Sequence, residues 1–392
     1  MRRIYIPLLL LLCPFTIGAD NFSDVLNTIV TNNLTTKYNV ASDYAKIEEM
    51  KGENQLEAPE VEFERVWGAK NVGNKWGLSV TQSFDWPGVY KARKEAISKS
   101  EYAMHYLRES SVLDVRMEVR LALIDLIYTR QKMNVTKGLS ESMGKLMESY
   151  RIAAERGEET RLDYNKVVIE KIQINRELKS LEGQFAVAVS SLESLNGGEP
   201  VTPLLDAIGD SYPDYSLSQL APTPESIKEK DPQYAAAMAS IEANKSLVKV
   251  EKMSRIPGFS IGYVHENEMG ENFNGFSFGI TLPFLTGKSK VRAANLQTEA
   301  LNFEAEIILT QRVAEMNGVY KQAQAIHDFI NEYEPVINSD ANLQLLKKAF
   351  DGGQISLLTY LQEVTYFRTA YNDYLDTVYE YQQALAKLSR YM

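Results

Sequence analysis

The sequence predicts an α+β membrane protein made of two copies of one unit, in which a helix, a β-hairpin and two further helices follow one another. Three observations predict it: a stretch of alternating apolar and polar residues, a second such stretch further along the chain, and long proline-free segments between them. Alternation with a period of two is typical of a strand with two unlike faces, whereas three-and-four spacing is typical of an amphipathic helix.

The clearest strand is the stretch WGLSVTQSFDW, residues 76–86. Its apolar residues are Trp76, Leu78, Val80, Phe84 and Trp86. The residues between them are small or polar, and they include Ser79 and Thr81. This alternation predicts one apolar face and one polar face on the same strand.

The same pattern returns in the second half of the chain, where GFSFGITLPF (275–284) aligns with KWGLSVTQSF (75–84). In the second stretch Phe278 and Ile280 fall on one face of the expected strand. Ser277 and Thr281 fall on the other face. A repeat of this kind is the first thing to establish in a sequence, because it fixes the architecture.

Each of these strands has an upstream partner that begins at a proline, Pro59 in the first half and Pro257 in the second. The segments between the partners, GAKNVGNK and NEMGENFNG, are rich in glycine and asparagine. Strands separated by such segments read as hairpins, with the segments as their turns. The expected hairpins cover about 59–86 and about 257–285.

A second correspondence lies downstream, where AERGEETRLDY (154–164) aligns with FDGGQISLLTY (350–360). It places Gly157 on Gly353 and Thr160 on Ser356. Two matches in the same order predict two structural repeats. We expect the first repeat at 20–199, the second at 231–392, and a linker or equatorial segment at 200–230.

Long helices are expected between these marks, at about 89–155, 160–196, 288–350 and 356–391. No proline occurs from Val89 to Ala154. Some sixty residues of helix, at a rise of 1.5 Å each, would span roughly 100 Å. Gly157 is expected to end the first helix and Thr160 to cap its return helix. Pro335 should kink or interrupt the corresponding helix of the second repeat.

Heptad seams run along both return helices and predict coiled-coil-like packing. The first seam comprises Leu178, Leu181, Phe185, Ala188, Leu192 and Leu195. The second comprises Phe367, Tyr371, Tyr374, Val378, Tyr381, Leu385 and Leu388. We interpret the aromatic residues of the second seam as core packing and not as a ligand site.

The first 19 residues resemble a secretory signal peptide, with Arg2 and Arg3 before a leucine-rich stretch that is too short for a membrane-spanning helix. A lipid anchor on Cys13, the only cysteine, is the alternative, but leucines precede it where small residues are expected. The chain carries a net charge of −10, which argues against nucleic acid as a partner.

The sequence contains no pattern that predicts an enzyme, a cofactor or a metal site. The three histidines, His105, His265 and His327, are far apart in the sequence and lack metal-ligand spacing. Neither a nucleophile elbow, a phosphate-binding loop nor a dinucleotide fingerprint occurs. The many carboxylates are interpreted as solvated helix faces.

The predicted strands have the length of tilted bilayer crossings. Four strands cannot close a barrel, and open edges are not tolerated in lipid, so several chains must combine. Two chains would give eight strands with a filled interior, and three would give twelve strands with a lumen. The expected lipid-facing residues are Leu78, Val80, Phe278 and Ile280. The expected lumen-facing residues are Ser79, Thr81, Ser277 and Thr281. A soluble sheet packed on the helices is the alternative.

The chain resembles the TolC-type outer-membrane efflux channels of Gram-negative bacteria. The resemblance rests on the duplicated unit, on PEVEFE before the first hairpin, on LSVTQSFDWPG followed by YKAR, and on the two G-x-x-[ST] turns. Bacteroides-like and cation-efflux members look most similar. The resemblance implies a homotrimer with one twelve-stranded barrel in outer-membrane lipid and a long helical barrel in the periplasm.

The resemblance also implies partners: a periplasmic adaptor (membrane fusion) protein and, through it, an inner-membrane pump. The adaptor-docking turns map onto Gly157, Thr160, Gly353 and Ser356. Family members carry acidic residues after the second turn, but Thr359 and Gln362 stand at those positions, so the gate is expected to differ. The candidate gate residues are Asp163, Thr359 and Gln362. The expected function is a passive export conduit, and a soluble periplasmic coiled-coil adaptor or scaffold is the alternative.

Overall fold

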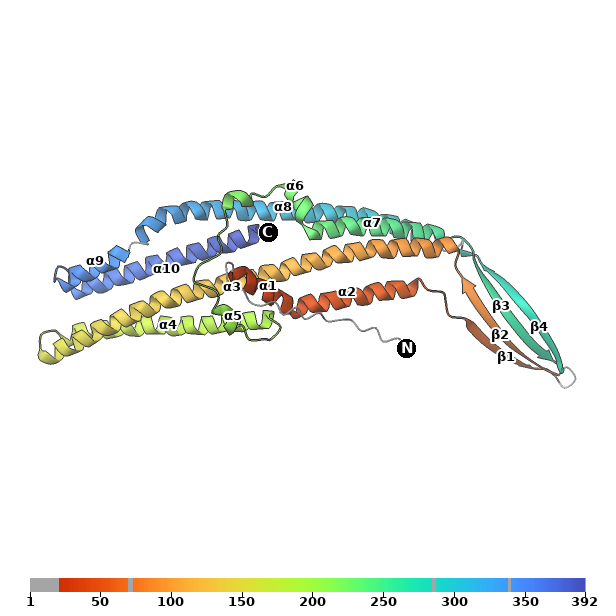
Figure 1. Ribbon diagram of the computed structural model, residues 1–392, viewed down its shortest axis with the longest axis horizontal. Helices are drawn as coiled ribbons and strands as arrows, with labels where there is room; N and C mark the ends of the chain where they lie inside the picture. Colours follow the sequence, from red (N-terminus) through yellow and green to blue (C-terminus); the bar gives the residue numbers. More distant parts are fainter. Residues whose placement is uncertain (1–20, 70–72, 284–286, 338–339, 392) are drawn as a thin grey trace.

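The computed structural model describes residues 21–69, 73–283, 287–337 and 340–391, and the expected signal peptide lies outside these ranges. The molecule is long and narrow, with the strands at one end and, at the other, two turns that each connect one helix to the next (Figure 1). These two connections are called the helical turns. Among the described helices, none combines the length and the hydropathy that a membrane span requires.

The first half contains α1 (Asn21–Asn32), α2 (Leu34–Glu53), β1 (Glu60–Trp67), β2 (Asn74–Phe84), α3 (Pro87–Arg156) and α4 (Arg161–Leu195). The middle segment contains α5 (Thr202–Leu205), η1 (Leu217–Leu220) and α6 (Pro224–Lys230). The second half contains α7 (Pro232–Met253), β3 (Gly258–Glu268), β4 (Glu271–Thr281), α8 (Gly287–Ile337), α9 (Asp340–Asp351) and α10 (Leu357–Leu388).

Helix α3 connects the two ends of the molecule (Figure 1). It has 70 residues, which corresponds to a length of about 105 Å. Pro87 occupies its first turn, where the missing N–H is not needed. Because α3 contacts α7, α4, α10, α2 and α1, it is the element on which the rest of the chain is assembled.

The second half has two helices, α8 and α9, in the place of α3, and they are not collinear, as the kink expected at Pro335 predicts. Pro335 lies inside α8, which ends two residues later at Ile337, and α9 begins at Asp340. Figure 1 shows α9 offset from the line of α8.

Four helices and four strands form one continuous wall. The helices pack in the order α2, α3, α7, α8, and the strands pair in the order β1, β2, β3, β4. Each strand is joined in sequence to the helix with the same place in the order. The wall thus has two lateral edges, one made of α2 and β1 and the other of α8 and β4.

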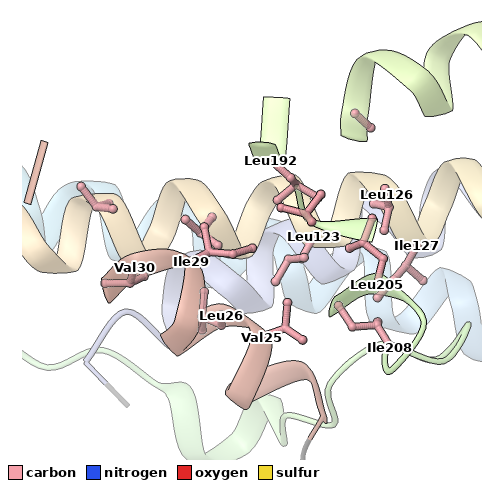
Figure 2. Packing of buried hydrophobic residues seen from close by; sticks show 14 residues of the cluster. Val25, Leu26, Ile29, Val30, Leu123, Leu126, Ile127, Leu192, Leu205 and Ile208 are labelled. Atoms are coloured by element: carbon pink, nitrogen blue, oxygen red, sulfur yellow. The ribbon is translucent and has the colours of Figure 1, made fainter. Parts of the chain in front are cut away.

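The main core lies at the middle of the molecule, where α1 packs on α3 and α4. Figure 2 shows Leu26 and Ile29 of α1 against Leu123 of α3, with Leu192 of α4 close by. Each such buried aliphatic side chain contributes about 1.5–3 kcal/mol. The core fixes α1 and α4 onto α3, the longest helix among the described residues.

The middle segment, 200–230, is not a free linker. Val201, Leu205 and Ile208 are buried in the core of the first half. Leu220 and Ile227 are buried in a second cluster with residues of α8 and α10. The segment therefore crosses between the two halves and packs on both.

The predicted heptad seams form part of the packed interior. In α4 the seam residues Leu181, Ala188 and Leu192 are buried. In α10 the seam residues Tyr374 and Leu385 are buried. Packing between helices accounts for these residues of both heptad seams, as the sequence predicts.

Candidate functional site

The sheet is an antiparallel meander whose register defines two faces. Residues directly opposite one another on paired strands point to the same side. Val80 of β2 is opposite Val61 of β1 and Tyr263 of β3, and Tyr263 is opposite Phe276 of β4. One row of apolar side chains therefore crosses all four strands.

The apolar face extends over most of the sheet. Its apolar members are Val61, Phe63, Trp67, Trp76, Leu78, Val80, Phe84, Phe259, Ile261, Tyr263, Phe276, Phe278 and Ile280, and the same side also carries Arg65 and Gln82. In the single chain Phe278 is 80% exposed and Ile280 is 71% exposed. A contiguous apolar surface of this size marks a membrane or protein contact.

Aromatic side chains lie at both ends of the apolar face. Near the helices, the rings of Phe84 and Phe259 stack with their centroids 5.2 Å apart. Near the hairpin turns, the Trp76 ring lies 5.3 Å from that of His265, and Trp67 is 71% exposed. Two aromatic bands around an apolar zone are typical of strands that cross a lipid bilayer.

The opposite face carries mainly small, hydroxyl and acidic side chains, with Val66, Val264 and Phe273 as its apolar members. Its polar members are Glu60, Glu62, Glu64, Lys75, Ser79, Thr81, Ser83, Ser260, Glu266, Glu268, Glu271, Ser277 and Thr281. This face is tightly packed at the end of the sheet near the helices. A Cβ on Gly262 would lie 2.5 Å from the Ser277 hydroxyl and 2.8 Å from that of Thr81. Sequence analysis assigned no face to β1, although the alternation in EVEFERVW carries that signal.

Both lateral edges of the sheet are open in the described chain. Strand β1 pairs only with β2, and β4 pairs only with β3. Such edges present unpaired N–H and C=O groups that another strand can bond. The open edges and the exposed apolar face occur together on one sheet.

The second hairpin turn is much shorter than the sequence predicted. Strand β3 continues to Glu268 and β4 begins at Glu271, so only Met269 and Gly270 form the turn. Both have positive φ, 51° and 90°, as a two-residue hairpin turn requires. Residues 272–274, expected in a loop, belong to β4.

The helical turns at the far end have the local structure that the sequence predicts. Gly157 has a φ of 76°, and the N–H of Glu158 donates to the Ala153 carbonyl at 2.9 Å. This is a left-handed helix cap. Thr160 then caps α4 by accepting from the Asp163 N–H at 3.1 Å.

The second turn repeats this arrangement. Gly353 has a φ of 69°, and the N–H of Gln354 donates to the Ala349 carbonyl at 2.8 Å. Ser356 caps α10 by accepting from the Thr359 N–H at 3.2 Å. Thr359 therefore occupies the place in the second turn that Asp163 occupies in the first.

Asp163 is held by local contacts. Its carboxylate accepts from Lys166 Nζ at 2.9 Å and from the Thr160 hydroxyl at 2.5 Å. The hydrogen bond from Lys166, followed by that from Thr160, lowers the pKa of the Asp163 carboxyl. Gln362 is exposed on α10. No hydrogen bond or ion pair joins the three candidate gate residues within the described chain.

The two helical hairpins contact one another through a cluster that the sequence did not reveal. Met143, Val167 and Ile174 of the first hairpin pack with Leu357 and Leu361 of the second. A polar contact runs beside this cluster. An Arg368 guanidinium nitrogen lies 3.3 Å from a Glu170 carboxylate oxygen and 3.9 Å from one of Glu177.

A single sequence does not show which helices are neighbours, so it cannot predict contacts of this kind.

The described residues hold no group of three or more His, Cys, Asp or Glu side chains that could bind a metal ion.

Solved structures share this fold over nearly the whole chain. A membrane protein from Pseudomonas aeruginosa is 17% identical, with a TM-score of 0.75 over 96% of this chain and 93% of that chain. The Campylobacter jejuni CmeC outer membrane channel is 16% identical, with a TM-score of 0.75 over 95% and 85%. CusC, described in the context of transmembrane channel formation, is 13% identical, with a TM-score of 0.72 over 93% and 90%.

No family model matches the sequence, and no curated protein matches it. The fold is therefore assigned from the similarity to these solved structures. The chain has the fold of outer-membrane channels, a class in which long helices continue a four-stranded sheet. The resemblance to TolC-type channels is confirmed for the fold, while the likeness to Bacteroides-like members stays a prediction.

Proposed function

We propose that the protein is the outer-membrane channel subunit of a tripartite efflux system and acts as a passive export conduit. The observation that carries this proposal is the two-faced sheet with open edges. Its apolar face suits lipid, its polar face suits water, and its edges suit strands of further copies. The fold shared with channels such as CmeC supports it.

Closure by three copies accounts for the edges. Backbone groups at a strand edge cannot remain unpaired in hydrocarbon, so β4 of one copy must pair with β1 of the next. Three copies give twelve strands, enough to leave a lumen, whereas eight strands fill their interior with side chains. The helical edges pair in the same way: α8 of one copy packs against α2 of the next, which closes a helical barrel on the periplasmic side of the sheet.

The faces follow from this closure. Leu78, Val80, Phe278 and Ile280 face outer-membrane lipid. Ser79, Thr81, Ser277 and Thr281 line the lumen. A soluble adaptor or scaffold, the alternative considered from the sequence, would leave the exposed Phe278 and Ile280 in water.

The helical turns are the proposed contact with a periplasmic adaptor, which would link the channel to an inner-membrane pump. Gly157, Thr160, Gly353 and Ser356 form two similar turns at the end distant from the sheet (Figure 1). In the arrangement proposed here that end lies deepest in the periplasm. Asp163, Thr359 and Gln362 follow the turns and are the proposed gate residues.

The molar mass in detergent and the conductance test the proposal together. Light scattering of the purified mature protein should give three copies per particle, and planar bilayers should show discrete channels. A folded monomer without channel activity would contradict the proposal. Outer-membrane fractionation supplies the matching test in cells.

A further inference from the structure

A groove lies where the helices meet the sheet, along the seam between α3 and α7. It has a volume of about 320 Å³ and is lined by Gly88, Lys91, Ala92 and Glu95 of α3 and by Lys249, Lys252 and Met253 of α7. Its floor is apolar: Ala92 is only 8% exposed, and it packs with Met253. Lysine side chains form the rim.

The groove opens on the side of the wall that carries the apolar face. Trp86 continues the alternation of β2 beyond Phe84, and its ring reaches within 3.3 Å of where a Cβ on Gly88 would lie. Asp85 has the opposite parity and pairs with Arg93 at 2.8 Å. Helical geometry places Arg93 on the side of α3 opposite Lys91, so the groove and the polar face lie on different sides.

The rim carries an excess of positive charge. Lys249 pairs with Glu95 at 2.8 Å. Lys91 and Lys252 are exposed, and neither has an ion-pair partner among the described residues. Two free ammonium groups thus flank a slot with an apolar floor.

We propose that this groove binds an anionic phospholipid of the periplasmic leaflet. An acyl chain lies over Gly88, Ala92 and Met253 beside Trp86, and the headgroup phosphate lies between Lys91 and Lys252. The inference rests on the proposed function, since that function places Trp86 at the inner interface of the membrane. Tryptophan is enriched at such interfaces, and lysines next to them attract anionic lipid headgroups.

The combination of features favours a lipid over other anions. A soluble anion needs the two ammonium groups but not the apolar floor, whereas an acyl chain needs a floor that continues into an apolar surface. The groove adjoins Trp86, which leads to the exposed face of the sheet. A lipid in this place would tie the helical wall to the membrane at the point where the chain changes from strand to helix.

Native mass spectrometry of the trimer with added phosphatidylglycerol tests the proposal. The variant combines Lys91→Gln with Lys252→Gln. A lysine beside an anionic lipid surface contributes about fivefold to affinity, so the double variant should bind phosphatidylglycerol about thirtyfold more weakly. The matched control, Lys137→Gln with Lys321→Gln, removes two exposed lysines far from the sheet and should bind as the wild type does.

Equal phosphatidylglycerol binding by wild type and the Lys91/Lys252 variant would overturn the inference. Inorganic phosphate separates the two sources of this chemistry: it should not displace bound lipid, and displacement at equal concentration would assign the groove to free phosphate. Phosphatidylcholine, which has no net charge, should bind the wild type more weakly. If the protein fails to form membrane-inserted trimers, the proposed function fails; inserted trimers with unchanged lipid affinity refute this inference alone.

Discussion

Val80 and Ser79 are adjacent in β2, yet they lie on opposite faces of the sheet: Val80 is opposite Val61 and Tyr263, while Ser79 is opposite Glu62 and Val264. Val80 is 41% exposed in the single chain. A soluble sheet would therefore tolerate an arginine at Val80, whereas a lipid-facing sheet would not. The two positions separate these alternatives.

Val80→Arg should deplete the outer-membrane trimer, and Ser79→Arg should not. An arginine near the bilayer midplane costs roughly 2–4 kcal/mol, and a trimer incurs this cost three times. At Ser79 the arginine enters water opposite Glu62, where opposite charges attract. Trimer yield after membrane extraction measures the difference, and equal yields of both variants would argue for a soluble sheet.

The glutamates of β1 should make the pore prefer cations. Glu60, Glu62 and Glu64 lie on the polar face, where Lys75 is the only basic side chain among the described strand residues. Charges that line a pore of low-dielectric walls concentrate counter-ions. The reversal potential in a KCl gradient should indicate cation preference in the wild type and a weaker preference when all three become glutamine, because Glu266, Glu268 and Glu271 remain on this face.

The control for this prediction is a variant that should shift the reversal potential in the opposite direction. Lys75 lies 2.8 Å from the Glu266 carboxylate, so Lys75→Gln removes a positive charge and frees a negative one. Its cation preference should exceed that of the wild type. A reversal potential that changes in neither variant would mean that this face does not line the conduction path.

The strand faces were predictable because alternation is a local property of the sequence, as Val80 and Ser79 illustrate. The second turn was not, because polar residues were interpreted as loop. In the structure those residues pair across the strands: the Asn267 side-chain amide donates to Asn272 at 2.7 Å, and the Tyr263 hydroxyl donates to Asn274 at 2.8 Å. Side-chain hydrogen bonds thus extend a ladder that composition alone would end.

The helix caps were predictable for the same local reason, since Thr160 and Ser356 each follow a glycine at short distance. Contacts between helices were not. Between Glu170 and Arg368 the chain passes through the middle segment, α7, β3, β4, α8 and α9, and nothing in α4 or α10 specifies the other as its neighbour. Tertiary packing supplies that information.

Arg368→Gln should loosen the contact between the two helical hairpins. The side chains of Arg368 and Glu170 are 15% and 13% exposed, so the variant leaves a largely buried carboxylate with weaker partners. The cost of such a group is about 1–3 kcal/mol. Amide hydrogen exchange should accelerate in α4 and α10 near the turns.

The matched control is Arg151→Gln, which removes an arginine whose ion pairs with Glu148 and Glu155 are exposed and lie within one helix. Exposed pairs contribute little, so exchange at the turns should stay near the wild-type rate. Equal exchange in the Arg368 and Arg151 variants would show that the hydrophobic cluster alone joins the hairpins.

The double change Gly157→Asp with Gly353→Asp should abolish export while leaving the trimer intact. Both glycines have positive φ, and a Cβ at either position meets no atom within 4 Å. Aspartate tolerates this conformation better than most residues do, so the turns should keep their shape. The added charges would lie on the surface proposed to contact the adaptor.

Asparagine at both positions is the control, because it has the same size and backbone demand without the charge. Export assays and light scattering should show an active trimer for the asparagine pair and an inactive trimer for the aspartate pair. Undiminished export in the aspartate pair would remove the docking role from these turns, and loss of the trimer in both pairs would assign the glycines to folding.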